Sequence, residues 1–279
     1  MTSMGMMEFS IGKQARRTGA YSGLGIYFIN DIGGDSKFSI KTGGVTASGV
    51  LPISKAHAIS AGIQVGYSNR SADFSRLTFY NQWDGTQFDP NIDPNEVNGV
   101  NSFSHLDAGV GVAYSYNKDN ENTLSASDLS FQGGFSMQHL NRPTLRYNSL
   151  VDDKLPIKMC IHANLRYGLS PESNLEFSAA QFIQAQYLET IGGMFYRLKM
   201  KSASRVTSFV SDQYFVIGCY FRSTGAIIPS FFLDLGGFTI GVSYDYELGK
   251  IASMYRQSVE VSLKFNFGKK SIFSSSKMR

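Results

Sequence analysis

Long apolar stretches are absent from this chain, and charged residues are scarce. Charged residues make up 17% of the 279 residues, and 28 glycines stand against 7 prolines. No run of roughly 18 or more uncharged apolar residues occurs, which excludes a membrane-spanning helix. The mean hydropathy is slightly negative although aromatic residues reach 13%. Such a composition arises when apolar and polar residues alternate along the chain.

Clustered positive charge and a secretion signal are also missing. The net charge of +4 is diffuse. Its densest parts, Arg16-Arg17 and the tail from Gly268 to Arg279, lack the interleaved aromatic residues of a nucleic-acid surface, so we expect no nucleic-acid partner. The segment from Met1 has no basic stretch followed by an apolar one. We therefore expect the sequence to begin downstream of a signal peptide and one opening strand.

Apolar and polar residues alternate with a period of two in many segments, the pattern of half-buried strands. The last of these segments has Val261, Leu263 and Phe265 on one face and Glu260, Ser262 and Lys264 on the other. Segment 173–187 is less regular because Gln181 and Phe182 are out of phase, and Pro229 limits pairing in 225–235. We predict about 13 strands, over residues 4–11, 20–32, 37–51, 56–69, 104–116, 127–138, 155–168, 173–187, 189–200, 213–222, 225–235, 236–248 and 256–267.

Three features favour a transmembrane barrel over a soluble all-β binding domain built as a sandwich. The segments are about 10–14 residues long, which suits a tilted strand that crosses a bilayer. The polar face is rich in Gly, Ser and charged residues, as a barrel lumen requires. Aromatic residues lie near strand ends, where interfacial girdles occur: Tyr67, Tyr114, Tyr116, Tyr167, Tyr187, Tyr196, Tyr246 and Phe267.

The connections and the strand count complete the predicted architecture, an all-β antiparallel transmembrane β-barrel. Residues 117–120 and 170–173 have the composition of short periplasmic turns, whereas 70–103 and 139–154 are typical of long extracellular loops. A single-chain bacterial barrel has an even number of strands, so we expect 14 in the full-length protein. The barrel domain is expected over 1–268, followed by a basic polar tail over 269–279.

Several stretches of the chain match one known family in their order and spacing. From Leu129 onward they begin with Gly134-Phe135-Ser136-Met137-Gln138-His139-Leu140-Asn141-Arg142-Pro143 and end with Ser258-Val259-Glu260-Val261-Ser262-Leu263. Upstream they include Phe28-Ile29-Asn30-Asp31 and Gln82-Trp83-Asp84-Gly85-Thr86. In these stretches the chain resembles the PorP/SprF family of outer-membrane proteins, which belong to the type IX secretion and gliding machinery. The resemblance implies a non-enzymatic barrel of the bacterial outer membrane. Such a barrel supports secretion, or anchors a secreted surface protein or adhesin through its C-terminal domain, together with other type IX secretion components and outer-membrane lipid.

A general diffusion porin is the alternative function. The lumen face is predicted to collect charges of both signs, which favours an internally neutralised interior over a pore selective for one sign. These residues are Lys158, His162, Arg166, Glu176, Asp245, Glu247, Glu260 and Lys264. The long loops carry exposed aromatic residues, and aromatic side chains often anchor protein interfaces. We therefore predict partner-binding residues at Tyr80, Trp83, Phe88 and Tyr147.

Motifs for catalysis, metal binding or cofactor binding are lacking. The four histidines, His57, His105, His139 and His162, have no metal-ligand spacing, and no motif joins His139 to a serine as a lipase would need. Segment 89–100 has Pro94 and Val100 where an EF-hand needs Gly and Glu. We expect no catalytic residue, no metal and no cofactor. Alternation places Cys160 and Cys219 on opposite faces, which argues against a disulfide.

Overall fold

The computed structural model describes residues 1–12, 19–73, 77–93, 102–118, 129–148, 151–201, 212–249 and 257–266, without the side chains of 147–148 and 151–152. Some predicted features lie outside the described residues. They are the side chain of Tyr147, the turn residues 119–120, Phe267 and the tail over 269–279.

Thirteen strands form one antiparallel sheet in which every strand pairs with its neighbours in chain order, apart from one inserted hairpin. The predicted strands are confirmed within a few residues at each end. The strands are β1 (Thr2–Ile11), β2 (Tyr21–Gly33), β3 (Phe38–Pro52), β4 (His57–Ser71), β5 (Ser102–Asn117), β6 (Leu129–Gln138), β9 (Lys158–Ser170), β10 (Ser173–Gln184), β11 (Tyr187–Lys201), β12 (Gln213–Arg222), β13 (Ala226–Asp234), β14 (Phe238–Glu247) and β15 (Gln257–Phe265).

Both long loops contain elements that the alternation did not predict. The hairpin of β7 (Thr144–Asn148) and β8 (Val151–Lys154) follows β6, and a short 3-10 helix, η2 (Tyr80–Gln82), lies between β4 and β5. Leu145 and Leu155 are buried at the base of the hairpin. The hairpin therefore has its own packing contacts, which a prediction of an irregular loop did not include.

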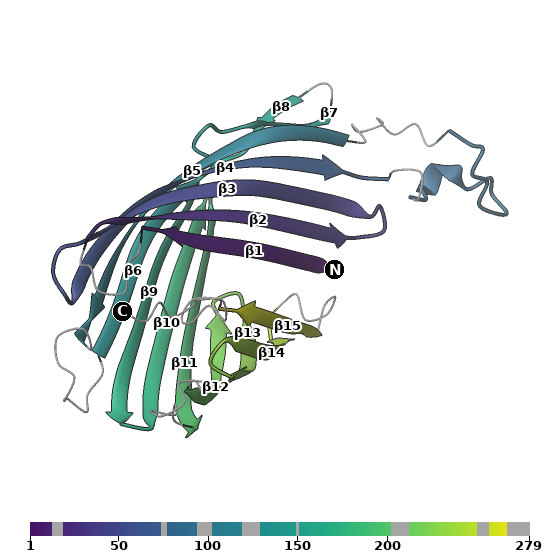
Figure 1. Ribbon diagram of the computed structural model, residues 1–279. Coiled ribbons are helices and arrows are strands. Elements are labelled where there is room, and N and C mark those ends of the chain that lie inside the picture. The colour runs from purple at the N-terminus through teal and green to yellow at the C-terminus, as the bar shows by residue number, and fades with distance from the viewer. Residues whose placement is uncertain are drawn as a thin grey trace, which may run out of the picture.

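The sheet curls round a central space, which gives it a convex and a concave face (Figure 1). Alternate residues of each strand point to opposite faces. The convex set includes exposed apolar side chains such as Leu24, Ile63, Val112 and Ile161. The concave set is rich in glycine, serine and charge. The alternation seen in the sequence therefore separates an apolar outer surface from a polar inner one.

The two long connections, from β4 to β5 and from β6 to β9, leave the sheet at the same end, here called the loop end, where the short turns 34–37, 185–186 and 223–225 also lie. The short turns 53–56 and 171–172 lie at the other end, the turn end. This separation agrees with the predicted loops and turns. On the convex face, Tyr67 and Tyr246 lie towards the loop end, and Tyr114, Tyr116 and Tyr167 towards the turn end. Tyr187 instead shares the concave side with Gln184.

The residue pairing between strands tests several local predictions. Pro229 pairs with Cys219, but the ladder towards β14 skips Ile228 and Pro229, as expected of a residue without an N–H. Phe182 lies on the concave side, where the ammonium nitrogen of Lys158 sits 5.0 Å from its ring centroid. Cys160 and Cys219 are free thiols on opposite faces, so the expected absence of a disulfide is confirmed for this pair.

Candidate functional site on the concave face

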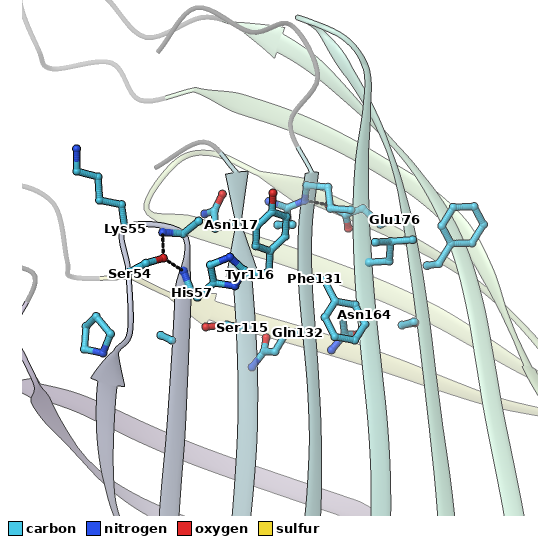
Figure 2. Close-up of a pocket in the computed structure, with 18 of the residues that line it drawn as sticks. Ser54, Lys55, His57, Ser115, Tyr116, Asn117, Phe131, Gln132, Asn164 and Glu176 are labelled. Carbon is cyan, nitrogen blue, oxygen red and sulfur yellow. Dashed lines mark hydrogen bonds and ion pairs between the residues drawn. The ribbon is translucent and has the colours of Figure 1, made fainter. Parts of the chain in front are cut away.

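A cavity of about 900 Å³ opens on the concave face near the turn end (Figure 2). Its lining includes four neutral polar residues on neighbouring strands: Ser115 on β5, Gln132 on β6, Asn164 on β9 and Ser178 on β10. Each pairs directly with the next across the sheet, so the four form one straight row, here called the polar row. Neighbouring strands lie about 4.8 Å apart, which sets the spacing of these side chains.

The side chains of the polar row have no hydrogen-bond partner among the described residues. Ser115, Gln132 and Asn164 are exposed to the cavity. Within the described part of the chain, none of the four side chains has a hydrogen bond or ion pair, and the Ser178 hydroxyl is buried without a partner. The row therefore presents free donors and acceptors to whatever occupies the cavity.

An aromatic pair ends the polar row. Ser178 pairs with Gly193 on β11, and Gly193 pairs with Tyr220 on β12. The rings of Tyr220 and Phe195 meet edge to face, with centroids 4.6 Å apart at an interplanar angle of 60°. Both residues line the cavity. The cavity thus has an amide and hydroxyl side and an aromatic side.

Glycines make room for these rings. The Tyr220 ring lies across Gly193 and the Phe195 ring across Gly218, so a Cβ atom at either glycine would overlap an aromatic ring. The same arrangement recurs where Phe232 of β13 covers Gly241 of β14. These glycines are required by close packing on the concave side rather than by a turn.

Ion pairs flank the cavity at the turn end. The Arg166 Nε donates to Glu176 Oε1 at 2.8 Å, and the Arg197 Nε donates to the same oxygen at 2.6 Å. Arg197 also reaches Asp234 across β12, with an Nη1–Oδ2 distance of 3.5 Å. Of these four, only Arg166 and Glu176 were predicted to belong to the lumen set. The cluster has two positive and two negative groups and is therefore neutral.

A second cluster lies towards the loop end and is centred on Arg222. Its guanidinium donates to Asp245 Oδ2 at 2.5 Å and to Glu247 Oε1 at 2.9 Å, and its Nε lies 3.5 Å from Glu189. Sequence reasoning placed Asp245 and Glu247 on this face but missed Arg222 and Glu189. The period-two alternation could have predicted both residues. Arg222 is two residues after Tyr220 on β12, and Glu189 is on the same face of β11 as Gly193.

Both ion-pair clusters lie on the concave side of β9–β14, which we call the charged wall. The concave side of β2–β6 differs from it. A single row of small residues crosses these strands. It consists of Gly23, Ser48, Gly62, Gly111 and Ser136. Nearby, the Tyr27 ring lies across Gly44, and its hydroxyl accepts a hydrogen bond of 2.7 Å from Gln64 Nε2. We call β2–β6 the small-residue wall.

The segment that follows β6 supplies hydrogen bonds to the backbone of β5 where β6 no longer pairs with it. β5 pairs with β6 only from Val110 onward, and beyond that point the Asn141 side chain bonds to both Ala108 N–H (3.2 Å) and Leu106 C=O (2.8 Å). His139 Nδ1 lies 2.9 Å from the buried Asp107 carboxylate. His139, considered above for a lipase-like site, thus holds this segment through a carboxylate.

Three of the four predicted partner-binding residues, Tyr80, Trp83 and Phe88, lie on residues 77–93, here called the aromatic loop. It projects from the ends of β4 and β5 (Figure 1). Tyr80, Trp83 and Phe88 are 96%, 54% and 41% exposed. Gln82 is buried beneath them, accepting from Phe79 N–H and donating to Ile92 C=O, both at 3.1 Å.

A turn at Asp84 makes the tip of the aromatic loop compact. Asp84 Oδ1 accepts from the N–H groups of Thr86 and Gln87, both at 2.7 Å. These hydrogen bonds, that of Gln87 first, hold the pKa of the Asp84 carboxyl below its usual range. Gln82 and Asp84 hold the shape of the aromatic loop. The sequence did not predict this role, because a glutamine or an aspartate in a polar loop has no distinctive pattern.

Metal-binding geometry and helical spans were also sought in the described ranges. No three or more His, Cys, Asp or Glu side chains converge there to hold a metal ion. No helix in those ranges is long and apolar enough to cross a membrane.

Comparison with known proteins identifies the family. None of the curated proteins matches the chain. Among solved structures, the toluene transporter TbuX of Ralstonia pickettii is 8% identical, with a TM-score of 0.41, 88% of this chain and 82% of that chain covered. The FpvAI–pyocin S2 complex is 10% identical, with a TM-score of 0.35 and coverages of 95% and 44%.

A family model described as "Type IX secretion system membrane protein PorP/SprF" matches residues 6–265. The match confirms the resemblance seen in the sequence, and the chain belongs to the PorP/SprF family of type IX secretion system membrane proteins.

Proposed function

We propose that this protein is a non-enzymatic β-barrel of the bacterial outer membrane that anchors a secreted surface protein, through that protein's C-terminal domain, during type IX secretion. The observation that carries the proposal is the convex face of the sheet, which exposes apolar side chains from β2 to β15. Soluble proteins rarely expose an apolar surface of this extent. Outer-membrane lipid is the partner that would cover it.

Backbone chemistry supports closure of the sheet into a barrel. β1 and β15 are the edges of the sheet, and unpaired backbone groups in lipid each cost several kcal/mol. Thirteen strands in alternating directions leave β1 and β15 parallel. One further strand, antiparallel to both, would give the fourteen of a closed antiparallel barrel.

The aromatic loop is the proposed contact for the secreted partner. Tyr80, Trp83 and Phe88 are exposed on a segment that Gln82 and Asp84 hold in shape. A preorganised loop loses less conformational entropy when it binds. Tyr147 belongs to the same proposal through its place in the neighbouring long loop. Other type IX secretion components are expected partners of the assembled complex.

The charged wall favours a neutralised interior over a pore that selects one sign of charge. Arg166, Glu176, Arg197 and Asp234 neutralise one another on the concave face, so no single sign of charge is left to select solutes. We expect the purified protein to conduct poorly in planar bilayers. Large and stable conductance without an associated protein would favour the porin.

Copurification in mild detergent tests the proposal. We expect a secreted protein with a type IX C-terminal domain to remain bound and to be identified by mass spectrometry. Replacing Tyr80 and Trp83 by alanine should reduce its recovery at least tenfold. The matched control is Tyr187→Ala, which removes another exposed aromatic residue at the loop end. Equal recovery with all variants would contradict the assignment of the aromatic loop, and recovery of no secreted protein would contradict the anchoring role.

A further inference from the structure

We propose that the cavity at the turn end binds a linear glycan along the polar row. The site consists of Ser115, Gln132, Asn164 and Ser178, with Tyr220 and Phe195 at its β11–β12 end. This role is separate from the anchoring of a protein at the loop end. It rests on the spacing of the row, on its chemistry and on the aromatic pair.

The spacing of the row fits sugar rings. The four residues occupy successive strands, about 4.8 Å apart, and run perpendicular to the strands. In an extended glycan the rise per ring is close to this spacing, so each ring can meet one side chain. An extended peptide advances about 3.3 Å per residue and presents equivalent groups only at every second residue, which does not fit this spacing.

The chemistry of the row favours a neutral polyhydroxylated ligand. Amide and hydroxyl side chains both donate and accept, as sugar hydroxyls do. Two of the charged residues that line the cavity, Arg166 and Glu176, are bonded to each other at 2.8 Å and are not free for an ionic ligand, and Lys55 lies in the turn at the cavity edge. The Ser178 hydroxyl is buried without a partner in the described structure. A ligand hydroxyl that reached it would satisfy a donor that is otherwise costly to bury.

The aromatic pair supplies the apolar contact that sugar rings need. The Tyr220 ring lies across Gly193 and is partly exposed, whereas the Phe195 ring is only 5% exposed and packs against it as a support. The C–H groups on one side of a pyranose form an apolar surface that packs on an aromatic ring. A row of hydrogen-bonding groups that ends at an aromatic ring therefore matches both surfaces of a sugar chain.

Binding of defined oligosaccharides tests the inference. The full chain, purified in lauryldimethylamine oxide so that no detergent sugar competes, is titrated with cellohexaose and with maltohexaose by calorimetry. We expect saturable binding of at least one of them, weakened at least tenfold by the double change Gln132→Ala and Asn164→Ala. Gln181→Ala removes a glutamine from the opposite face and should leave binding unchanged. Tyr220→Phe should retain binding, and Tyr220→Leu should lose it.

Three outcomes would overturn the inference. The first is no binding of either oligosaccharide by protein whose thermal unfolding is cooperative. The second is binding that the polar-row variants leave intact. The third is tighter binding of a Ser/Gly hexapeptide than of the sugars, which would identify a peptide channel. None of these outcomes affects recovery of the secreted protein, so failure here and failure of the anchoring role are separable.

Discussion

The small-residue wall and the charged wall share one alternation pattern but differ on the concave side. On β2–β6 glycine, serine and threonine are the commonest inward residues, beside a few larger ones such as Tyr27 and His105. On β9–β14 the inward residues include long charged and aromatic side chains that pair or stack across three or four strands. The convex residues are alike in both halves. The comparison teaches that one strand pattern can build both an open surface and an interlocked one, and the polar row lies where the two meet.

The largest expected effect is on the charged wall. Arg222→Met leaves Asp245, Glu247 and Glu189 without their shared cation, and removal of one partner from such a cluster costs about 3–5 kcal/mol. The free energy of unfolding, measured with urea in detergent, should fall by this amount. Gln64→Met on the small-residue wall breaks one hydrogen bond to Tyr27 and should cost only about 1 kcal/mol. Equal losses for the two variants would remove the distinction between the walls.

The next effect concerns the space under the stacked rings. Gly218→Ala places a methyl group against the Phe195 ring and the Met194 carbonyl, and overpacking of this kind costs about 1–3 kcal/mol. Gly192→Ala on the neighbouring strand is the matched control, because the nearest atom to its Cβ would be the Ser178 carbonyl oxygen at 4.0 Å. Urea unfolding of both variants compares them directly. If Gly192→Ala is the more damaging change, the packing described for the charged wall is wrong.

A smaller, local effect is expected at the loop-end edge of the small-residue wall. Asn141→Ala removes two hydrogen bonds from β5, each contributing about 1 kcal/mol. Asn141→Asp keeps the acceptor for Ala108 N–H and replaces the donor to Leu106 C=O by a carboxylate oxygen. Hydrogen exchange at Ala108 should therefore accelerate strongly in the alanine variant and weakly in the aspartate variant. Unchanged exchange in both would mean that the side chain does not replace a strand there.

The smallest effect is a pH dependence of the aromatic loop. The lowered pKa of Asp84 means that its turn is stabilised above the ordinary carboxyl range and is lost as pH falls through the folded pKa. Trp83 is the chain's only tryptophan, so its fluorescence reports on this turn. We expect a transition below about pH 3.9, absent in Asp84→Asn. A midpoint above that value would contradict the hydrogen bonding described for Asp84.

Period-two alternation was sufficient to predict the strands and the polar inward face. Glu260, Ser262 and Lys264 share one face as expected, and the thirteen strands of the sheet were all anticipated. The side-chain pairs were not, because they depend on register between strands. Arg197 meets Asp234 only because β12 lies between their strands with the observed alignment.

The aromatic loop and the polar row were beyond sequence reasoning for different reasons. Trp83 and Tyr80 could be selected as exposed aromatic residues, but the role of Gln82 depends on a bond to Ile92 that no local pattern predicts. Ser115, Gln132, Asn164 and Ser178 are ordinary polar residues on four separate strands. Only the pairing of those strands brings them into one row.

Lipid exposure of the convex face is the most direct test of the central claim, that this sheet is a membrane barrel with a polar interior. Spin labels at Val261, Leu263 and Phe265, in protein reconstituted into bilayers, should collide with oxygen dissolved in lipid. Labels at Ser262 and Lys264 should instead collide with a water-soluble nickel reagent. The alternation should persist along β15, with opposite accessibility at successive residues. Water exposure at 261, 263 and 265 would contradict the barrel and, with it, the proposed place of this protein in the outer membrane.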